Sequence, residues 1–257
     1  MMNHSLAIMG WLSLLLIGVS PGARAKEEGR QGEMVTFASG SETIQGYLAR
    51  PAGDGPHPAI LLIHEWWGLN DWMKGNADRF AQQGYTALAV DLYRGAVAQD
   101  RDVAHELSRG LPEDRAARDL QGAFAYLQSR PDVRKDKIGV SGWCMGGGYA
   151  LQAALKISGL KACVICYGRL VLDANTLKPI PCPLLGIFGG QDRGIPPEMV
   201  HQFEAACKTA GKEVTAHIYE KSGHAFMNPN NASGYNAGDA RDAWAQIDAF
   251  FEQTLKK

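Results

Sequence analysis

Short apolar runs alternate with longer amphipathic segments along most of this chain. Apolar runs that are typical of strands buried on both faces of a sheet lie at Ala59–Ile63, Thr86–Val90, Ala162–Cys166 and Leu184–Phe188. Two further strands are predicted at Lys137–Val140 and Val214–Tyr219. Helical spacing of apolar positions predicts helices at Asp71–Gln83, Gln99–Arg109, Glu113–Arg130, Gly146–Ile157, Pro197–Ala210 and Asp239–Leu255. This alternation predicts an α/β fold with a mostly parallel central sheet and helices on both faces.

The segment before the first buried run has a different pattern. Met34–Ser39 and Ile44–Arg50 alternate weakly around Ser39-Gly40-Ser41, as the two strands of an antiparallel hairpin do. After this hairpin we find no internal repeat, low-complexity tract or domain linker. Because 257 residues can form one large domain, we expect a single domain.

The first residues resemble an export signal more than a part of the fold. Leu6–Val19 is apolar apart from Gly and Ser, and Ala23-Arg24-Ala25 has the small-x-small pattern that a signal peptidase cuts after. The apolar run is too short for a comfortable membrane span. We therefore expect residues 1–25 to be a signal peptide, residues 26–257 to be the mature domain, and the location to be periplasmic or secreted. An uncleaved N-terminal anchor is the alternative; after cleavage no membrane association is expected.

Composition limits the range of partners. Charged residues make up 21% of the chain and the formal net charge is -1, with no long run of either sign. This balance does not favour nucleic acid or an anionic membrane surface as a partner. Five cysteines form an odd set, and the Cys163-Val-Ile-Cys166 pair lies inside an apolar run rather than at a helix start. That pair is therefore interpreted as structural rather than redox-active.

The most informative motif is Gly142-x-Cys144-x-Gly146, which stands between a predicted strand and a predicted helix. This is the pattern of a nucleophile on a sharp turn, whose flanking glycines avoid collisions, and its context is that of an α/β-hydrolase fold. The helix N-terminus favours the thiolate form of Cys144. The backbone N–H of Met145 points into the same space and could stabilise an oxyanion.

Two later loops supply the expected partners of Cys144. In this fold the order along the chain is nucleophile, acid, histidine. Asp192 follows the strand Leu184–Phe188, and His224 follows the strand Val214–Tyr219. We expect His224 to take the thiol proton and Asp192 to fix the tautomer of the imidazole. Trp66, just after the strand Ala59–Ile63, is expected to provide the second oxyanion N–H.

Metal chemistry is not indicated by the sequence. His64-Glu65 begins like the zinc motif H-E-x-x-H, but the position of the second histidine is Gly68. No other cluster of Cys, His and carboxylate residues has ligand spacing. We therefore expect no metal and no cofactor.

Several motifs together resemble the dienelactone hydrolase (carboxymethylenebutenolidase) family. They span nearly the whole predicted mature chain in the family's order: His64-Glu65-Trp66-Trp67-Gly68, Asp91-Leu92-Tyr93, Gly142-Trp143-Cys144-Met145-Gly146-Gly147, Gly189-Gly190-Gln191-Asp192 and Gly223-His224-Ala225-Phe226. The resemblance implies an α/β-hydrolase fold and hydrolysis of a small ester or lactone. It also implies that Glu65 contacts the resting thiol and, once substrate binds, is freed to take the thiol proton.

The positions expected to bind substrate depart from the family's pattern. The family binds an anionic substrate with one arginine just after Asp-Leu-Tyr and another four residues after the histidine. Here Arg94 comes one residue earlier than in that pattern, and Asn228 occupies the second position. Because one of the two arginines that would bind the substrate carboxylate is missing, the expectation that the substrate is a dienelactone is weakened. Candidate substrate-binding residues are Arg94, Tyr93, Trp67, Trp143, Phe226 and Asn228, although the aromatic ones are as compatible with the core.

The leading hypothesis is a cysteine hydrolase that cleaves a small-molecule ester or lactone through a thioester intermediate. A second hypothesis is peptidase or acyltransferase chemistry on the same fold. A third is a periplasmic binding protein in which the three residues Cys144, His224 and Asp192 are idle. The sequence leaves the physiological substrate and the oligomeric state open.

Overall fold

The structure, a computed structural model, describes Met1 and residues 32–257. The predicted signal peptide, residues 1–25, lies almost wholly outside the described residues. Within the described part, no helix combines the length and the apolar character that crossing a membrane requires. The fold below is that of residues 32–257.

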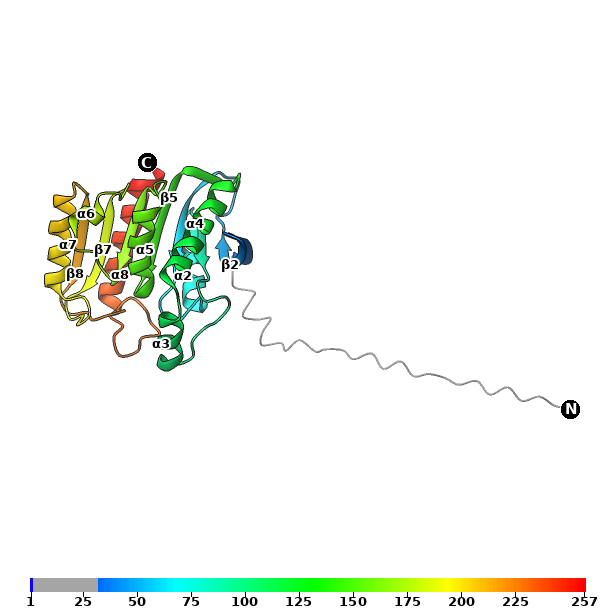
Figure 1. The fold of residues 1–257 in the computed structure, drawn as a ribbon, viewed down its shortest axis with the longest axis horizontal. Coiled ribbons are helices and arrows are strands. Elements are labelled where there is room, and N and C mark those ends of the chain that lie inside the picture. Colours follow the sequence, from blue (N-terminus) through cyan, green and yellow to red (C-terminus); the bar gives the residue numbers. More distant parts are fainter. Residues whose placement is uncertain (2–31) are drawn as a thin grey trace. The chain divides into compact units, whose positions relative to one another are not determined.

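Residues 32–257 form a sheet of eight strands in the order β1-β2-β4-β3-β5-β6-β7-β8 (Figure 1). The strands are β1 (Gly32–Ser39), β2 (Glu42–Ala49), β3 (His57–Ile63), β4 (Thr86–Val90), β5 (Val133–Trp143), β6 (Ala162–Cys166), β7 (Leu184–Gly189) and β8 (Val214–Tyr219). β2 pairs antiparallel with β1 and β4, and all other neighbours are parallel. The predicted α/β fold with a mostly parallel sheet is confirmed.

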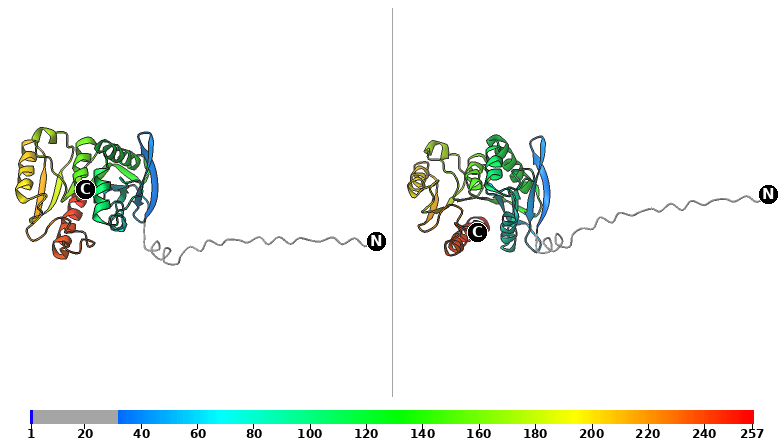
Figure 2. Two further views of the ribbon diagram at one scale, coloured as in Figure 1. Left: turned by 60° about the horizontal axis from the view of Figure 1, so that its bottom comes forward. Right: turned by 90° about the horizontal axis from the view of Figure 1, so that it is seen from below.

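Helices cover both faces of this sheet (Figure 2). The helices are α2 (Asp71–Gln82), α3 (Arg101–Arg109), α4 (Glu113–Ser129), α5 (Met145–Lys156), α6 (Ala174–Leu177), α7 (Pro197–Thr209) and α8 (Ala237–Phe251), and α8 continues as the π-helical turn η1 (Glu252–Lys256). Apolar residues of α4, α5 and α7 pack in one core, and those of α2 and α8 pack in the other. The sheet therefore lies between two layers of helices, as predicted.

The alternation of side chains along each strand explains the continuous apolar runs. In β3, Leu61 and Ile63 face one core, whereas Ile60 and Leu62 face the other. A strand buried on both faces needs apolar residues at every position.

The same alternation determines on which face of the sheet each cysteine of β6 lies. Cys163 belongs to the core under α5, and Cys166 belongs to the opposite core, so the two thiols lie on opposite faces of the sheet. Burial raises the pKa of both thiols well above its ordinary value. Their positions on opposite faces agree with the interpretation that this pair is structural rather than redox-active.

Element boundaries differ from the prediction where polarity and packing disagree. β5 was predicted as Lys137–Val140 but runs from Val133 to Trp143, because Val133 pairs with His57 of β3 and the regular pairing resumes after a register shift at Ile138. The one-turn helix α6 was not predicted, since four residues carry too little periodicity. The predicted hairpin is present, with Gly40 at a positive φ of 61° in its turn.

Candidate active site

Cys144 lies at the corner between β5 and α5. Its backbone is in the left-handed region, with φ 55° and ψ −118°, a conformation that a residue with a side chain rarely adopts. A Cβ atom on Gly142 would collide with the carbonyl of Gly146, and a Cβ on Gly146 would collide with the carbonyl of Ile63. The two glycines are therefore required by the tight turn that lifts the Cys144 side chain out of the sheet.

A chain of hydrogen bonds joins the three residues from distant loops. His224 Nε2 lies 3.1 Å from Cys144 Sγ, and His224 Nδ1 lies 2.6 Å from Asp192 Oδ2. The other carboxylate oxygen of Asp192 accepts hydrogen bonds from the backbone N–H groups of Gly194 (2.9 Å) and Ile195 (3.2 Å). The structure thus brings together the sulfur, the imidazole and the carboxylate.

Backbone contacts between the two loops set this geometry. Gly190 N donates to Tyr219 O (2.8 Å) and Gln191 N donates to Ser222 O (2.9 Å), which ties the Asp192 loop to the loop that carries His224. Both loops leave the carboxyl ends of adjacent parallel strands, β7 and β8. Neighbouring strand ends therefore deliver acid and histidine to the same edge of the sheet.

The electrostatics of this hydrogen-bonded series favour the charged form of the His224 imidazole. Burial alone lowers the pKa of His224, but the hydrogen bonds and charges of Asp192 and Cys144 outweigh it and raise the pKa to about 10. Burial would raise the pKa of Asp192, yet the His224 hydrogen bond and charge and the two backbone donors lower it below its ordinary value. His224 is therefore well suited to accept a proton from Cys144.

Glu65 is buried beside this group, with 2% of its surface exposed. Asn228 Nδ2 donates to its Oε2 (2.6 Å) and the Tyr167 hydroxyl donates to its Oε1 (3.4 Å). Burial raises the pKa of Glu65 to about 7 against the opposing effect of these partners. The resemblance implied that Glu65 contacts the resting thiol, but here the thiol is bonded to His224 and the carboxyl to Asn228.

His64 holds two loops together, and its hydrogen bonds do not go to the cysteine. It is fully buried; its Nδ1 lies 2.6 Å from Glu65 O, and its Nε2 accepts from Leu92 N at 3.3 Å. Burial lowers its pKa, so the neutral ring donates at Nδ1 and accepts at Nε2. His64 therefore joins the turn after β3 to the loop after β4.

A cleft of about 1130 Å³ opens beside the sulfur. Its aromatic and apolar lining comes from Trp66, Trp67, Leu69, Trp72, Val97, Ala98 and Ala225. Its polar lining includes the amide side chains of Asn70, Gln99, Asn228, Asn230 and Asn231. Cys144, His224 and Glu65 lie in the same cleft, which is large enough for a small organic ester.

The candidate substrate-binding aromatics divide into two groups. Trp67 lines the cleft, as does Trp66, which was predicted for the oxyanion amide. Trp143 is fully buried under the cleft, edge-on to Trp72 with ring centroids 5.8 Å apart. Phe226 is also fully buried. Trp143 and Phe226 therefore belong to the core, and the prediction that they contact substrate is not supported by their positions.

Tyr93 acts through a neighbour rather than on the cleft. It is 6% exposed and does not line the cleft, and its hydroxyl lies 3.2 Å from the sulfur of Met145. The first N–H groups of a helix have no partner inside the helix, and the Met145 N–H predicted for the oxyanion is one of these at the start of α5. Asn228 does line the cleft, through the amide that holds Glu65.

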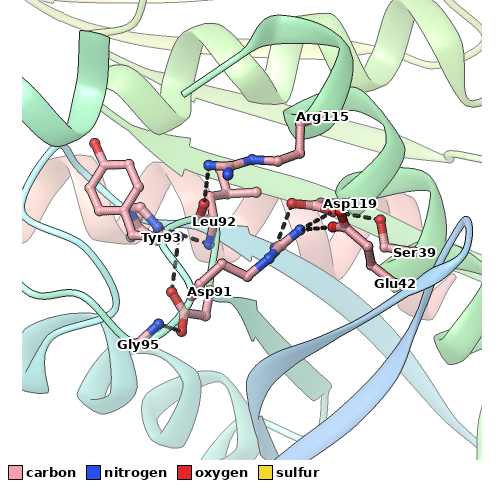
Figure 3. Close-up of polar contacts among 10 residues, drawn as sticks. Ser39, Glu42, Asp91, Leu92, Tyr93, Gly95, Arg115 and Asp119 are labelled. Carbon is pink, nitrogen blue, oxygen red and sulfur yellow. Dashed lines mark hydrogen bonds and ion pairs between the residues drawn. The ribbon is translucent and has the colours of Figure 1, made fainter. Parts of the chain in front are cut away.

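Arg94 is turned away from the cleft. Its guanidinium donates to Asp119 (2.8 Å) and Glu42 (2.9 Å), and Ser39 also donates to Asp119. Figure 3 shows Asp119, Glu42 and Ser39 on one side of the loop and Tyr93 on the other. A positive φ of 58° at Arg94 makes this reversal. Contrary to expectation, the structure therefore does not bring Arg94 to the site.

Sequence reasoning missed Tyr167. It follows β6, has a positive φ of 38°, and its ring lies 5.3 Å from the His224 ring while its hydroxyl donates to Glu65. The available signal was its place at the carboxyl end of a buried strand, where such folds gather functional groups. No site role was predicted for this tyrosine, because it directly follows an apolar run and no motif contains it.

Comparisons with known proteins point to one family. The sequence model described as the dienelactone hydrolase family matches residues 44–255. A protein of Methylorubrum extorquens that is named as a candidate carboxymethylenebutenolidase is 32% identical over 224 residues, which cover 82% of this chain and 77% of that protein.

Solved structures give the same result. A candidate dienelactone hydrolase from Klebsiella pneumoniae is similar with a TM-score of 0.80 and 27% identity, covering 86% of this chain and 98% of that one. An acylaminoacyl peptidase from Pyrococcus horikoshii has a TM-score of 0.70 at 20% identity, covering 93% of this chain and 44% of that one. At that identity the peptidase shows a common fold only.

Proposed function

This chain belongs to the dienelactone hydrolase family, and from that premise we propose that it hydrolyses small esters or lactones with Cys144 as the nucleophile. The observation that carries the proposal is the hydrogen-bonded series from Cys144 Sγ through His224 to Asp192 beside an open cleft. A thiol on a strained corner, within 3.1 Å of an imidazole, has the arrangement of an activated nucleophile.

In the first step the enzyme is acylated. His224 Nε2 takes the Sγ proton, and the sulfur attacks the carbonyl carbon of the ester. The N–H groups of Met145 and Trp66 stabilise the negative oxygen that forms. When the C–O bond breaks, the leaving oxygen takes the proton from His224, which yields an alcohol and a Cys144 thioester.

In the second step water releases the acid. His224 accepts a proton from water, and the resulting hydroxide attacks the thioester carbonyl. The C–S bond breaks, the sulfur recovers a proton from His224, and a carboxylic acid leaves the cleft. Asp192 holds the imidazole in one orientation throughout, because its Oδ2 stays bonded to Nδ1.

Two other functions remain as alternatives. A peptidase on this fold would need stronger protonation of the poor amine leaving group, whereas an ester or lactone leaves readily. A binding protein with idle residues would retain the cleft without turnover. The strained backbone at Cys144 favours the enzyme, because such strain is usually kept where it serves chemistry.

Burst kinetics with 4-nitrophenyl acetate test the proposal. We expect a burst equal to the enzyme concentration, its loss in Cys144→Ala, and a fall of about 100-fold or more in kcat/KM for Cys144→Ser. Cys182→Ala, which removes a buried thiol away from the cleft, is the matched control and should keep the burst. Unchanged turnover in Cys144→Ala would exclude the cysteine mechanism, and no turnover on any ester would favour a binding protein.

A further inference from the structure

The inner end of the cleft is acidic. Cys144 and His224 form an ion pair once the thiol proton is transferred, so together with the Asp192 carboxylate they carry a formal charge of −1. Glu65 lines the same cleft and adds a second carboxyl group. The inner end therefore gains negative charge as Glu65 ionises.

Beyond His224, whose charge is already counted, no cation among the described residues acts on Glu65. The lysine and arginine side chains that line the cleft are Lys74 on α2 and Arg101 at the exposed start of α3. Arg94, the residue expected to bind a carboxylate, is paired with Asp119 on the far side of its loop. A carboxylate near the scissile bond would thus meet like charge without a partner.

The walls of the cleft suit an uncharged group. Trp66, Trp67 and Trp72 line it with partly exposed side chains, and Leu69 and Val97 add apolar surface. Trp66 and Trp67 pack edge to face, with ring centroids 5.2 Å apart, which fixes their orientation. Rigid aromatic surface of this kind gains free energy by covering an aryl or alkyl group.

Resting on the proposed function, we propose that this cleft selects uncharged esters or lactones with an aryl or other apolar group, and that Glu65 rejects substrates with a carboxylate beside the scissile bond. Selection against the wrong substrate by an unpaired like charge is a common source of specificity. The acidic inner end and the tryptophan wall act together, since one disfavours anions and the other favours apolar surface.

The surroundings of Glu65 make the selection dependent on pH. The groups that face it are Tyr167 and Cys166 from β6 and its end, and His224 and Asn228 from the segment after β8. Burial keeps Tyr167 and Cys166 neutral, and Asn228 has no charge. A proton that moves between Cys144 and His224 leaves their combined charge unchanged, so ionisation of Glu65 should change the local charge by one unit.

A matched pair of substrates tests whether a carboxylate on the substrate lowers kcat/KM. 4-Nitrophenyl hydrogen glutarate and its methyl ester differ in one carboxylate and release the same product. At pH 8.5 we expect kcat/KM to favour the methyl ester by about tenfold or more, from repulsion between like charges in a partly buried site. At pH 6 the preference should shrink, because Glu65 is then largely protonated while the substrate remains charged.

Variants show which side chain causes each substrate preference. Glu65→Gln should remove most of the pH dependence of the substrate preference, whatever it does to the rate itself, whereas Lys74→Gln should leave that dependence in place. Trp67→Ala should reduce kcat/KM for phenyl acetate at least fivefold more than for methyl acetate. Equal use of the pair, a preference for the free acid, or an unchanged pH dependence in Glu65→Gln would overturn the inference. Failure to hydrolyse either ester would instead contradict the proposed function.

Discussion

At the scale of single residues, the site depends on which atom holds the proton between Cys144 and His224. The imidazole is a strong acceptor here because Asp192 stabilises its charged form from the other side. Asp192 can do so because two backbone N–H groups and burial hold its carboxylate in place. Catalytic strength should therefore depend on a residue that does not touch the substrate.

Asp192→Asn tests this dependence. The amide retains the shape but not the charge, so the pKa of His224 should fall and the imidazole should adopt the wrong tautomer. We expect kcat/KM to fall by roughly 10²- to 10⁴-fold, with a changed pH profile. Asp54→Asn, in an exposed loop, is the control and should behave like wild type. A loss below threefold would contradict the role given to Asp192.

The sequence was sufficient to predict the meeting of Cys144, Asp192 and His224. Each follows a strand that the apolar pattern identifies, and the carboxyl ends of parallel strands share one edge. The partners of Glu65 and Arg94 were not predictable in this way. They depend on how the backbone turns at single residues, such as the positive φ of Arg94, and no periodicity encodes that turn.

At the scale of elements, Arg94 joins the loop after β4 to α4 and to the β1–β2 hairpin. Asp119 on α4 is completely buried and receives both Arg94 and Ser39, the last residue of β1. The loop after β4 that contains Arg94 also contains Tyr93, whose hydroxyl meets Met145 at the start of α5. The ion pair therefore supports the position of a loop next to Met145, whose N–H is the proposed oxyanion donor.

Asp119→Ala should destabilise the protein without touching the cleft. It leaves the Arg94 charge and the Ser39 hydroxyl without their buried acceptor, and part of that loss is relieved because the Arg94 side chain is 27% exposed. We expect the free energy of unfolding in urea to fall by about 2–4 kcal/mol. Glu42→Gln, which alters the exposed partner of the same arginine, should change it by less than about 1 kcal/mol. Equal effects of the two variants would contradict this account.

The elements themselves were predictable to different extents. Thr86–Val90, Ala162–Cys166 and Val214–Tyr219 were predicted with the bounds that the structure shows. β5 was too short in the prediction, since the charged residues near its start interrupt the apolar run and lie at the register shift between its two pairings with β3. The final helix was predicted as one piece, but its last turn widens to a π-helix that follows packing, not periodicity.

At the scale of the whole molecule, the N-terminal segment bears on where the protein is located. We propose that residues 1–25 direct export and are removed, on the pattern Ala23-Arg24-Ala25. Expression in a bacterium followed by intact-mass measurement of the periplasmic fraction should give a chain that begins at Lys26. Replacing Ala25 by a bulky residue, as in Ala25→Leu, should impair cleavage. A full-length chain confined to the membrane fraction would instead indicate an uncleaved anchor.

The dependence of stability on pH is a further property of the whole molecule. Below about pH 5 the lowered pKa of Asp192 means that stability rises with pH, because the unfolded chain then binds more protons. The pKa of Glu65 is raised from 4.5 to about 7, so the folded state binds more protons between these values and stability falls as pH rises. The raised pKa of His224 continues this decline from pH 6.5 towards pH 10.

Burial lowers the pKa of His64, so its contribution to stability rises with pH up to about 6.5 and offsets that of Glu65 there. Stability should therefore be greatest at mildly acidic pH and should decline clearly above about pH 6.5. For Glu65, which is 2% exposed, the shift corresponds to about 3 kcal/mol lost between pH 4.5 and pH 7. Thermal unfolding should show a Tm that is roughly 5 °C or more lower at pH 8 than at pH 5. Glu65→Gln should make the Tm rise with pH relative to wild type between pH 5 and pH 7, and Glu106→Gln on the exposed surface of α3 should not. If wild type and Glu65→Gln have the same slope, the buried carboxyl does not titrate in this range, and the pH-dependent selection of substrates proposed for the cleft loses its physical basis.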